Sequence, residues 1–150
     1  MLRRISVVAA AVLWWPVAMA HAQPEQCRWS SADAAAPVAD AADVAAMLRT
    51  AGADAQTQLG KPARLDPQGV SAVGDWGFLQ ARILGADGNW IDYAGTPFAD
   101  GSHSKSYVAL LRRAAGGGWA LVDTRVGPSD ALDENWPRQF ASPPVFWRCG

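Results

Sequence analysis

One stretch of the chain repeats its apolar residues with the period of an α-helix. Between residues 40 and 59 they recur every three or four positions, which places them on one side of a helix. These residues are Val44, Met47, Leu48, Ala51, Ala55 and Leu59. Asp40 is a suitable N-cap, and Gly60 followed by Pro62 is a typical stop signal. The pattern therefore predicts one long helix from about Asp40 to Leu59.

Downstream of this helix the pattern changes to short apolar runs separated by turn-forming residues, which is typical of β-strands. Apolar and polar side chains alternate through residues 76–84, so this strand should have one buried face. Asp87 and Gly88 form a hairpin signal, because both central residues of a type I′ turn need positive φ. Residues 90–93 are then expected to be the returning strand.

The remaining apolar runs predict a second hairpin. Its strands would be residues 107–111 and 119–125, joined around the glycines at 116–118. Farther on, Ser129 is a suitable cap for a short helix that ends near Pro137. One long N-terminal helix followed by an antiparallel meander predicts an α+β domain, with the helix packed on a curved antiparallel sheet of about four strands.

Three segments carry a resemblance to known proteins. Residues 74–78 (Gly-Asp-Trp-Gly-Phe), 109–113 (Ala-Leu-Leu-Arg-Arg) and 118–122 (Gly-Trp-Ala-Leu-Val) are similar to segments of small exported bacterial proteins of unassigned function. The order of elements resembles that of cystatin-like and NTF2-like domains. The resemblance covers about residues 60–136. It implies the same α+β fold, and it implies no catalytic residue.

The first residues have the parts of a secretory signal peptide in the expected order. Arg3 and Arg4 supply the positive charge, and residues 5–15 are an uncharged apolar run. The small residues that follow suit signal peptidase, with cleavage after Ala22 favoured and cleavage after Ala20 as the alternative. The apolar run is shorter than the roughly 20 residues that a membrane-spanning helix needs. We therefore expect a cleaved signal rather than a membrane anchor.

Removal of residues 1–22 would leave residues 23–150 as a single globular domain in the periplasm or outside the cell, without stable membrane insertion. The chain carries 13 basic and 14 acidic residues, a net charge of −1, and the signal peptide contains two of the basic ones. No basic cluster lies beyond Arg112 and Arg113. A nucleic-acid partner is therefore not expected.

The two cysteines lie near the two ends of the expected domain. In an exported protein an even cysteine count favours a disulfide over a metal site. The pairing of Cys27 with Cys149 is supported by their neighbours, because residues 27–29 (Cys-Arg-Trp) mirror residues 147–149 (Trp-Arg-Cys) as two antiparallel segments would. Such a bridge would stabilise the fold by about 4–5 kcal/mol in the chain-entropy account. Two free thiols are the alternative.

Few residues of the expected domain are suited to catalysis. His103 is its one histidine, and only carboxylates remain as metal ligands once the cysteines pair. Ser102 and Ser104 are too close to His103 in sequence for a catalytic triad, and no Gly-x-Ser-x-Gly elbow is present. No pair of carboxylates stands out for glycoside cleavage. We expect no catalytic residue, no metal and no cofactor.

Tryptophan is the unusual feature of the composition, with eight in the chain and two of them in the signal peptide. Most of the others begin predicted strands, and we expect them to fill the space between helix and sheet. Trp90 and Trp136 instead lie among polar residues. They are the candidates to line a groove for a sugar or a peptide.

A polar loop over residues 100–107 is the second candidate feature. It contains His103 and Lys105 and resembles the Ser-rich, Lys-Tyr loop of periplasmic lysozyme inhibitors, which plugs an active site that carries carboxylates. The resemblance implies that the loop could enter the acidic cleft of another protein. An ordinary connecting loop is the alternative.

These features favour an exported non-enzymatic binding protein that acts as an inhibitor or immunity protein on a cell-envelope enzyme. A second hypothesis is a small NTF2-like enzyme or ligand carrier, whose pocket would lie between helix and sheet. A third is a structural envelope domain without a partner. The candidate partners are therefore an envelope protein or a small molecule. The candidate binding residues are Trp90, Asp92, Tyr93, His103, Lys105 and Trp136.

Overall fold

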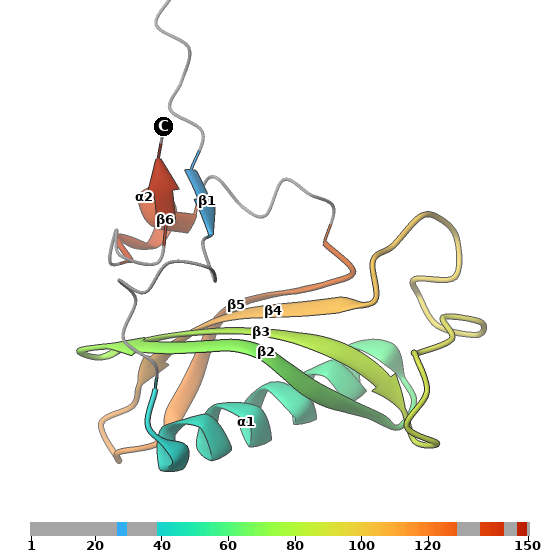
Figure 1. Ribbon diagram of the computed structural model, residues 1–150, viewed down its shortest axis with the longest axis horizontal. Coiled ribbons are helices and arrows are strands. Elements are labelled where there is room, and N and C mark those ends of the chain that lie inside the picture. The colour runs from blue at the N-terminus through green and yellow to red at the C-terminus, as the bar shows by residue number, and fades with distance from the viewer. Residues whose placement is uncertain (1–26, 30–38, 129–135, 143–146, 150) are drawn as a thin grey trace, which may run out of the picture.

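The computed structural model describes residues 27–29, 39–128, 136–142 and 147–149. Its elements, in chain order, are β1 (Cys27–Trp29), α1 (Ala41–Leu59), β2 (Ala63–Val73), β3 (Trp76–Gly85), β4 (Ser106–Arg113), β5 (Trp119–Val126), α2 (Trp136–Phe140) and β6 (Trp147–Cys149). Strands β2 to β5 form an antiparallel sheet in sequence order, and α1 packs across one face of it (Figure 1). The α+β prediction is confirmed. The expected signal peptide, residues 1–22, lies outside the described residues.

Helix α1 forms where the apolar period predicts it. The side chain of Asp40 accepts a hydrogen bond of 2.8 Å from the backbone N–H of Asp43, so it caps the first turn. The helix ends at Gly60, whose φ of 66° is left-handed and whose N–H donates to the Gln56 carbonyl. Its buried side is formed by Met47, Ala51, Ala55 and Leu59. No helix in the described part of the chain is long and apolar enough to cross a bilayer.

The hairpin of β4 and β5 is confirmed, and so is the alternation along residues 79–84 of β3. At the start of β3 both faces are buried, because Phe78 belongs to a cluster on the opposite face from Leu79. The predicted strand over residues 90–93 is wrong. There the chain makes one isolated bridge, between Leu84 and Trp90, before it leaves the sheet. The physical reason is that β4 pairs with the edge of β3 that residues 90–93 would have needed. The hydrogen bonds between β3 and β4 continue as far as the N–H of Ile83, which donates to the carbonyl of Lys105.

The sheet gains its remaining strand from β2, at one edge, which no sequence pattern had indicated. Its alternation is interrupted by a register shift between Pro67 and Gly69, so the strand does not show a clean period of two. As an edge strand it tolerates Pro67, which cannot donate to a neighbouring strand. The number of strands in the sheet therefore agrees with the prediction, but their identity does not.

The two faces of this sheet carry separate apolar clusters. We call the face that packs on α1 the inner face and the opposite one the outer face. The inner face is filled by the buried side chains of α1 and of the strands, among them Leu79, Ile83 and Leu111. The outer face carries a smaller buried cluster of Phe78, Val108, Leu110 and Trp136. Figure 1 shows α2, which carries Trp136, on this outer side.

The short C-terminal helix differs from its prediction. Its expected cap, Ser129, lies outside the described residues, and α2 begins at Trp136, close to where the helix was expected to end. Pro137 stands in the first turn of α2 rather than after its last turn. A proline is tolerated there, because the first N–H groups of a helix have no acceptor within it.

The tryptophans also divide between the faces. Trp119 fills the space between α1 and the sheet, as expected. Trp76 packs against the outer cluster, so the expectation that it lies beneath the helix is wrong. Trp136, a candidate to line a groove, is instead buried in the same outer cluster. Side chains alternate along a strand, and Trp76 is one position out of step with the inner residues of β3.

Strands β1 and β6 form a separate antiparallel pair, apart from the four-stranded sheet (Figure 1). The register places Cys27 opposite Cys149 and Trp29 opposite Trp147. The antiparallel pairing of the mirrored segments is therefore confirmed at the level of the backbone. The disulfide itself stays a prediction.

Candidate functional site

Five of the six candidate binding residues gather at the end of the molecule where α1 ends. Trp90, Asp92 and Tyr93 follow β3, and His103 and Lys105 precede β4. The sixth, Trp136, lies on the outer face of the sheet and has no exposed surface. Its indole Nε1 donates a hydrogen bond of 2.8 Å to Asp123. A ring enclosed in this way presents no surface to a ligand.

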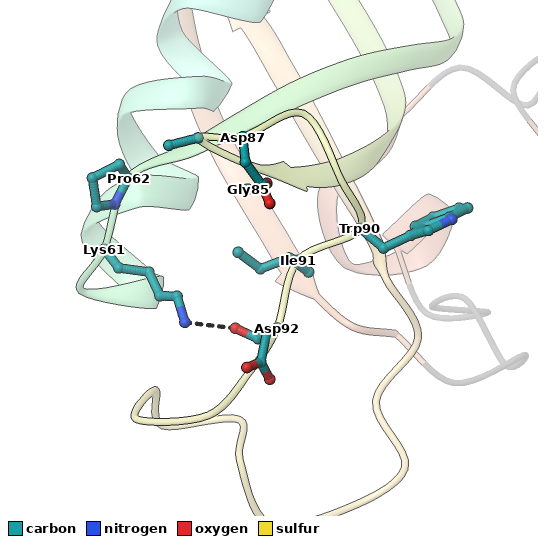
Figure 2. Close-up of a pocket in the computed structure, with 8 residues that line it drawn as sticks. Lys61, Pro62, Gly85, Asp87, Trp90, Ile91 and Asp92 are labelled. Carbon is teal, nitrogen blue, oxygen red and sulfur yellow. Dashed lines mark hydrogen bonds between the residues drawn. The ribbon is translucent and has the colours of Figure 1, made fainter.

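A cleft of about 360 Å³ opens at this end of the molecule, between the residues that follow α1 and the turn that follows β3. Figure 2 shows the residues that line it, which are Lys61, Pro62, Gly85, Ala86, Asp87, Trp90, Ile91 and Asp92. The cleft is not the pocket between helix and sheet that an NTF2-like carrier would use. That space is occupied by the buried side chains of the inner cluster.

The turn beside the cleft is organised by Asp87. One of its carboxylate oxygens accepts a hydrogen bond of 3.1 Å from the backbone N–H of Asn89, and the other accepts one of 2.8 Å from the Asn89 side chain. These bonds favour the charged carboxylate and hold the pKa of Asp87 below its usual value. Gly88, with a φ of 82°, supplies the left-handed backbone of the turn.

The segment after β3 has no neighbouring strand, and two lysines donate the hydrogen bonds that its backbone carbonyls would otherwise lack. The Lys61 ammonium donates to the carbonyls of Asp92 and Ala94, at 2.6 and 3.0 Å. The Lys105 ammonium donates to the carbonyl of Ile91. Backbone carbonyls without a neighbouring strand need other donors, and the ammonium groups supply them. Sequence reasoning missed Lys61, because it lies 31 positions from Asp92 and beyond the end of α1.

The rest of the loop is held by an aromatic cluster. The Tyr93 ring lies 5.9 Å from Phe98 and 6.2 Å from His103, between ring centres, and the Lys105 ammonium lies 4.5 Å from the Tyr93 ring centre. Tyr93 is buried and its hydroxyl donates to the carbonyl of Ser104, at 2.7 Å. Burial raises the pKa of Tyr93 to about 12. These side chains therefore fix the shape of the loop.

Trp90 is different from its neighbours because it is exposed. The residue retains 56% of its accessible surface, and no other large apolar residue whose burial is described is comparably exposed. Figure 2 shows its ring directed away from the side of the cleft that Lys61 and Asp87 occupy. The guanidinium of Arg82, on the outer face of β3, lies 5.4 Å from the ring centre. This distance is within the range of a cation–π contact.

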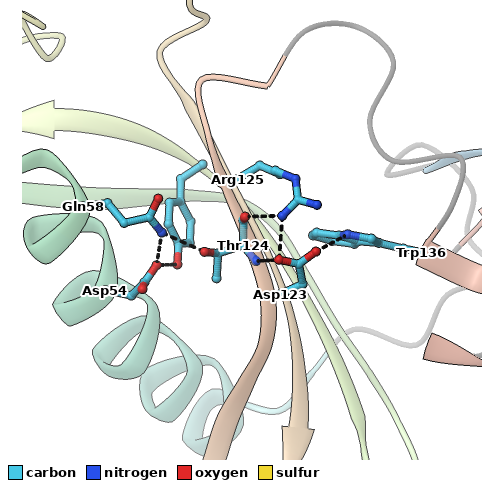
Figure 3. A network of polar contacts seen from close by, with 7 residues as sticks. Asp54, Gln58, Asp123, Thr124, Arg125 and Trp136 are labelled. Atoms are coloured by element: carbon cyan, nitrogen blue, oxygen red, sulfur yellow. Dashed lines mark hydrogen bonds and ion pairs between the residues drawn. The ribbon is translucent and has the colours of Figure 1, made fainter. Parts of the chain in front are cut away.

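A polar network at β5 joins the elements on both sides of the sheet. On the inner side, the hydroxyl of buried Tyr107 donates to Asp54 at 2.7 Å, and the Gln58 amide donates to Asp54 and to Thr124. Burial raises the pKa of Tyr107. Figure 3 shows Asp54 and Gln58 on one side of β5 and Trp136 on the other.

On the outer side, the adjacent residue Asp123 accepts from Trp136 and forms an ion pair with Arg125. Successive residues of a strand point to opposite faces, so Asp123 and its neighbour Thr124 serve different networks. In both networks the polar groups contact one another and connect packed elements. This arrangement connects α1 and α2 to the sheet.

No known protein family, curated protein or solved structure matches this chain. The similarity to cystatin-like and NTF2-like domains therefore stays a prediction. What the site can do follows from its own geometry. An exposed aromatic ring on a hydrogen-bonded turn, with a guanidinium beside it and a cleft next to it, is suited to binding.

Proposed function

We propose that the protein is an exported binding protein, acting as an inhibitor or immunity protein on a partner in the cell envelope, and that Trp90 is the centre of its contact surface. The exposure of Trp90 carries this proposal. Tryptophan is enriched among the residues that dominate binding energy at interfaces, and an exposed indole is accessible to a partner.

The surroundings of Trp90 support the proposal because they hold the residue in place. Asp87 closes the preceding turn, and Lys61 and Lys105 fix the carbonyls that follow. A contact residue on a preorganised turn loses less conformational entropy on binding than one on a loose loop. The signal peptide would take the protein to the envelope.

The proposed export is consistent with a Cys27–Cys149 disulfide, for which the backbone register of β1 and β6 is suitable. We predict that the intact mass of the protein isolated from the periplasm is lower by two hydrogens than that of the reduced chain. Two thiols that alkylate without prior reduction would contradict the prediction.

A small-ligand carrier is the second candidate function, and the cleft beside Trp90 favours it. Its volume of about 360 Å³ lies within the range of small-molecule sites. The ligand would then bind between the end of α1 and the turn at Asp87. Substitution of Pro62 or Asp87 would impair such binding, whereas substitution of Trp90 would have less effect because its ring points elsewhere.

Affinity capture from an envelope extract tests the first function. We expect the immobilised protein to retain a partner and Trp90→Ala to reduce the retained amount at least tenfold. Arg112→Gln is the matched control, since Arg112 also lies over a tryptophan ring, that of Trp76, on the same face of the sheet. Equal retention by Trp90→Ala, or no retained partner, would contradict the proposal.

A further inference from the structure

The surroundings of Trp90 on the outer face are basic. Trp90 bridges to Leu84, and Leu84 lies opposite Arg64 of β2, so these three residues form one row across the sheet. Arg82 is two positions from Leu84 and therefore points to the same face, diagonal to Arg64. Both arginines are exposed. We call Arg64, Arg82, Leu84 and Trp90 the Trp90 surface.

Neither arginine of this surface is neutralised by a carboxylate of the described residues. The ion pairs among the described residues join Arg113 to Asp43 and Arg125 to Asp123, and neither involves Arg64 or Arg82. Asp66 lies opposite Arg82 in the register, but its carboxylate accepts a hydrogen bond from the Gln68 side chain and no salt bridge with Arg82 forms. The surface therefore combines two guanidinium groups with two apolar side chains, and the carboxylate of Asp66 lies on the same face, opposite Arg82.

We infer that the Trp90 surface binds an acidic peptide segment of a partner protein. Carboxylates of the segment would pair with Arg64 and Arg82, and an apolar side chain next to them would cover Trp90 and Leu84. This inference rests on the proposed function and names the chemistry of its partner.

Charge complementarity favours an acidic segment over the other ligands for this surface. A cationic ligand would meet the guanidinium of Arg82, which already lies over the Trp90 ring. A neutral sugar would cover the ring but leave two cations without a counter-charge. Asp87 and Asp92 line the cleft, away from the direction of the Trp90 ring (Figure 2). They would repel an acidic segment that extended into the cleft, so the segment should follow the sheet.

A hexapeptide of alternating glutamate and leucine is a suitable probe for the ¹⁵N-labelled protein. We expect its titration to shift the indole resonance of Trp90 and the amide resonances of Arg64 and Arg82, while a lysine–leucine hexapeptide shifts none of them. Added NaCl should weaken binding, since exposed charges are screened by salt. A shift that does not depend on salt would contradict the inference.

Variants separate the charge contribution from the aromatic one. We expect Arg64→Gln and Arg82→Gln each to weaken peptide binding about threefold, in the range of exposed ion pairs, and Trp90→Ala to weaken it at least tenfold. Arg112→Gln should bind as the unchanged protein does. Equal losses in all three arginine variants would show an unspecific effect of net charge and would overturn the inference.

The outcomes also distinguish this inference from the proposed function. If a tetramer of N-acetylglucosamine shifts the Trp90 resonance and the acidic peptide does not, the surface takes a sugar and the inference fails. If neither probe binds but an envelope partner is still captured in a Trp90-dependent way, the acidic specificity fails and the proposed function stands. If the acidic peptide does not bind and no partner is captured in a Trp90-dependent way, both the inference and the proposed function fail.

Discussion

Two of the tryptophans on the outer side of the sheet, Trp90 and Trp136, differ in what surrounds them. Trp136 is buried against Phe78, with ring centres 6.3 Å apart, and its N–H donates to Asp123. Trp90 is 56% exposed. Each has a guanidinium close to its ring, at 5.7 Å for Arg125 over Trp136 and 5.4 Å for Arg82 over Trp90.

An arginine next to a tryptophan ring therefore has two roles on the outer side of the sheet. At Trp136 the guanidinium of Arg125 also pairs with Asp123, so the charge is balanced and the indole is enclosed. At Trp90 no acidic side chain of the described residues pairs with Arg82, and the ring is open. The polar partners and the burial of the ring, rather than the ring itself, therefore separate a packing tryptophan from one available for binding.

The largest effect expected from this comparison is on Trp136. We predict that Trp136→Ala lowers the free energy of unfolding by about 3–5 kcal/mol, because it removes the largest buried side chain of the outer cluster and leaves a cavity. Denaturant unfolding measures this change. A loss below about 1 kcal/mol would show that Trp136 does not hold α2 on the sheet.

A smaller effect is expected where the chain around Trp90 is fixed. Lys105→Met removes the ammonium that donates to the carbonyl of Ile91, and we predict a loss of about 1–2 kcal/mol in the free energy of unfolding. Amide hydrogen exchange between residues 91 and 94 should accelerate, while exchange in β4 and β5 should change little. Faster exchange throughout the sheet would contradict a local role.

The turn that precedes Trp90 should depend on pH. The hydrogen bonds from Asn89 lower the pKa of Asp87 in the folded protein, so their contribution is present above the unfolded value and is lost as pH falls through the folded one. We predict that the amide resonance of Asn89 titrates with a midpoint below 3.8. Asp87→Asn should abolish this titration. A midpoint at or above 3.8 would contradict the hydrogen-bonded turn.

The smallest effect on stability is expected at Trp90 itself. Trp90→Ala should change the free energy of unfolding by less than about 0.5 kcal/mol, since the side chain is mostly exposed. Thermal and denaturant unfolding measure this directly. A loss as large as that of Trp136→Ala would assign Trp90 to packing and remove the contrast between the two residues.

Sequence reasoning predicted the elements whose signals are local. The period, cap and stop of α1 lie within the helix, and the glycines at 116–118 lie within the hairpin that they close. It failed where a distant element decides. Residues 90–93 are apolar enough for a strand and follow a hairpin signal, but β4 pairs with β3 in their place. The register shift at Pro67 hid β2.

The candidate site was predicted in its position but not in the roles of its residues. Trp90, Asp92, Tyr93, His103 and Lys105 are close in sequence and come together in one region. That Tyr93 and Lys105 fix the loop, while Trp90 stays exposed, depends on acceptors that no periodicity reveals. The burial of Trp136 depends on the outer face of a sheet built from other segments.

Hydroxyl-radical footprinting with residue-level mass spectrometry tests the central claim, that Trp90 is an exposed contact residue and Trp136 a buried packing residue. In the free protein Trp90 should be oxidised much faster than Trp136, and addition of the captured envelope partner should protect Trp90 while Trp136 remains unchanged. Equal oxidation of the two tryptophans, or a Trp90 that stays as reactive in the complex as alone, would contradict the account.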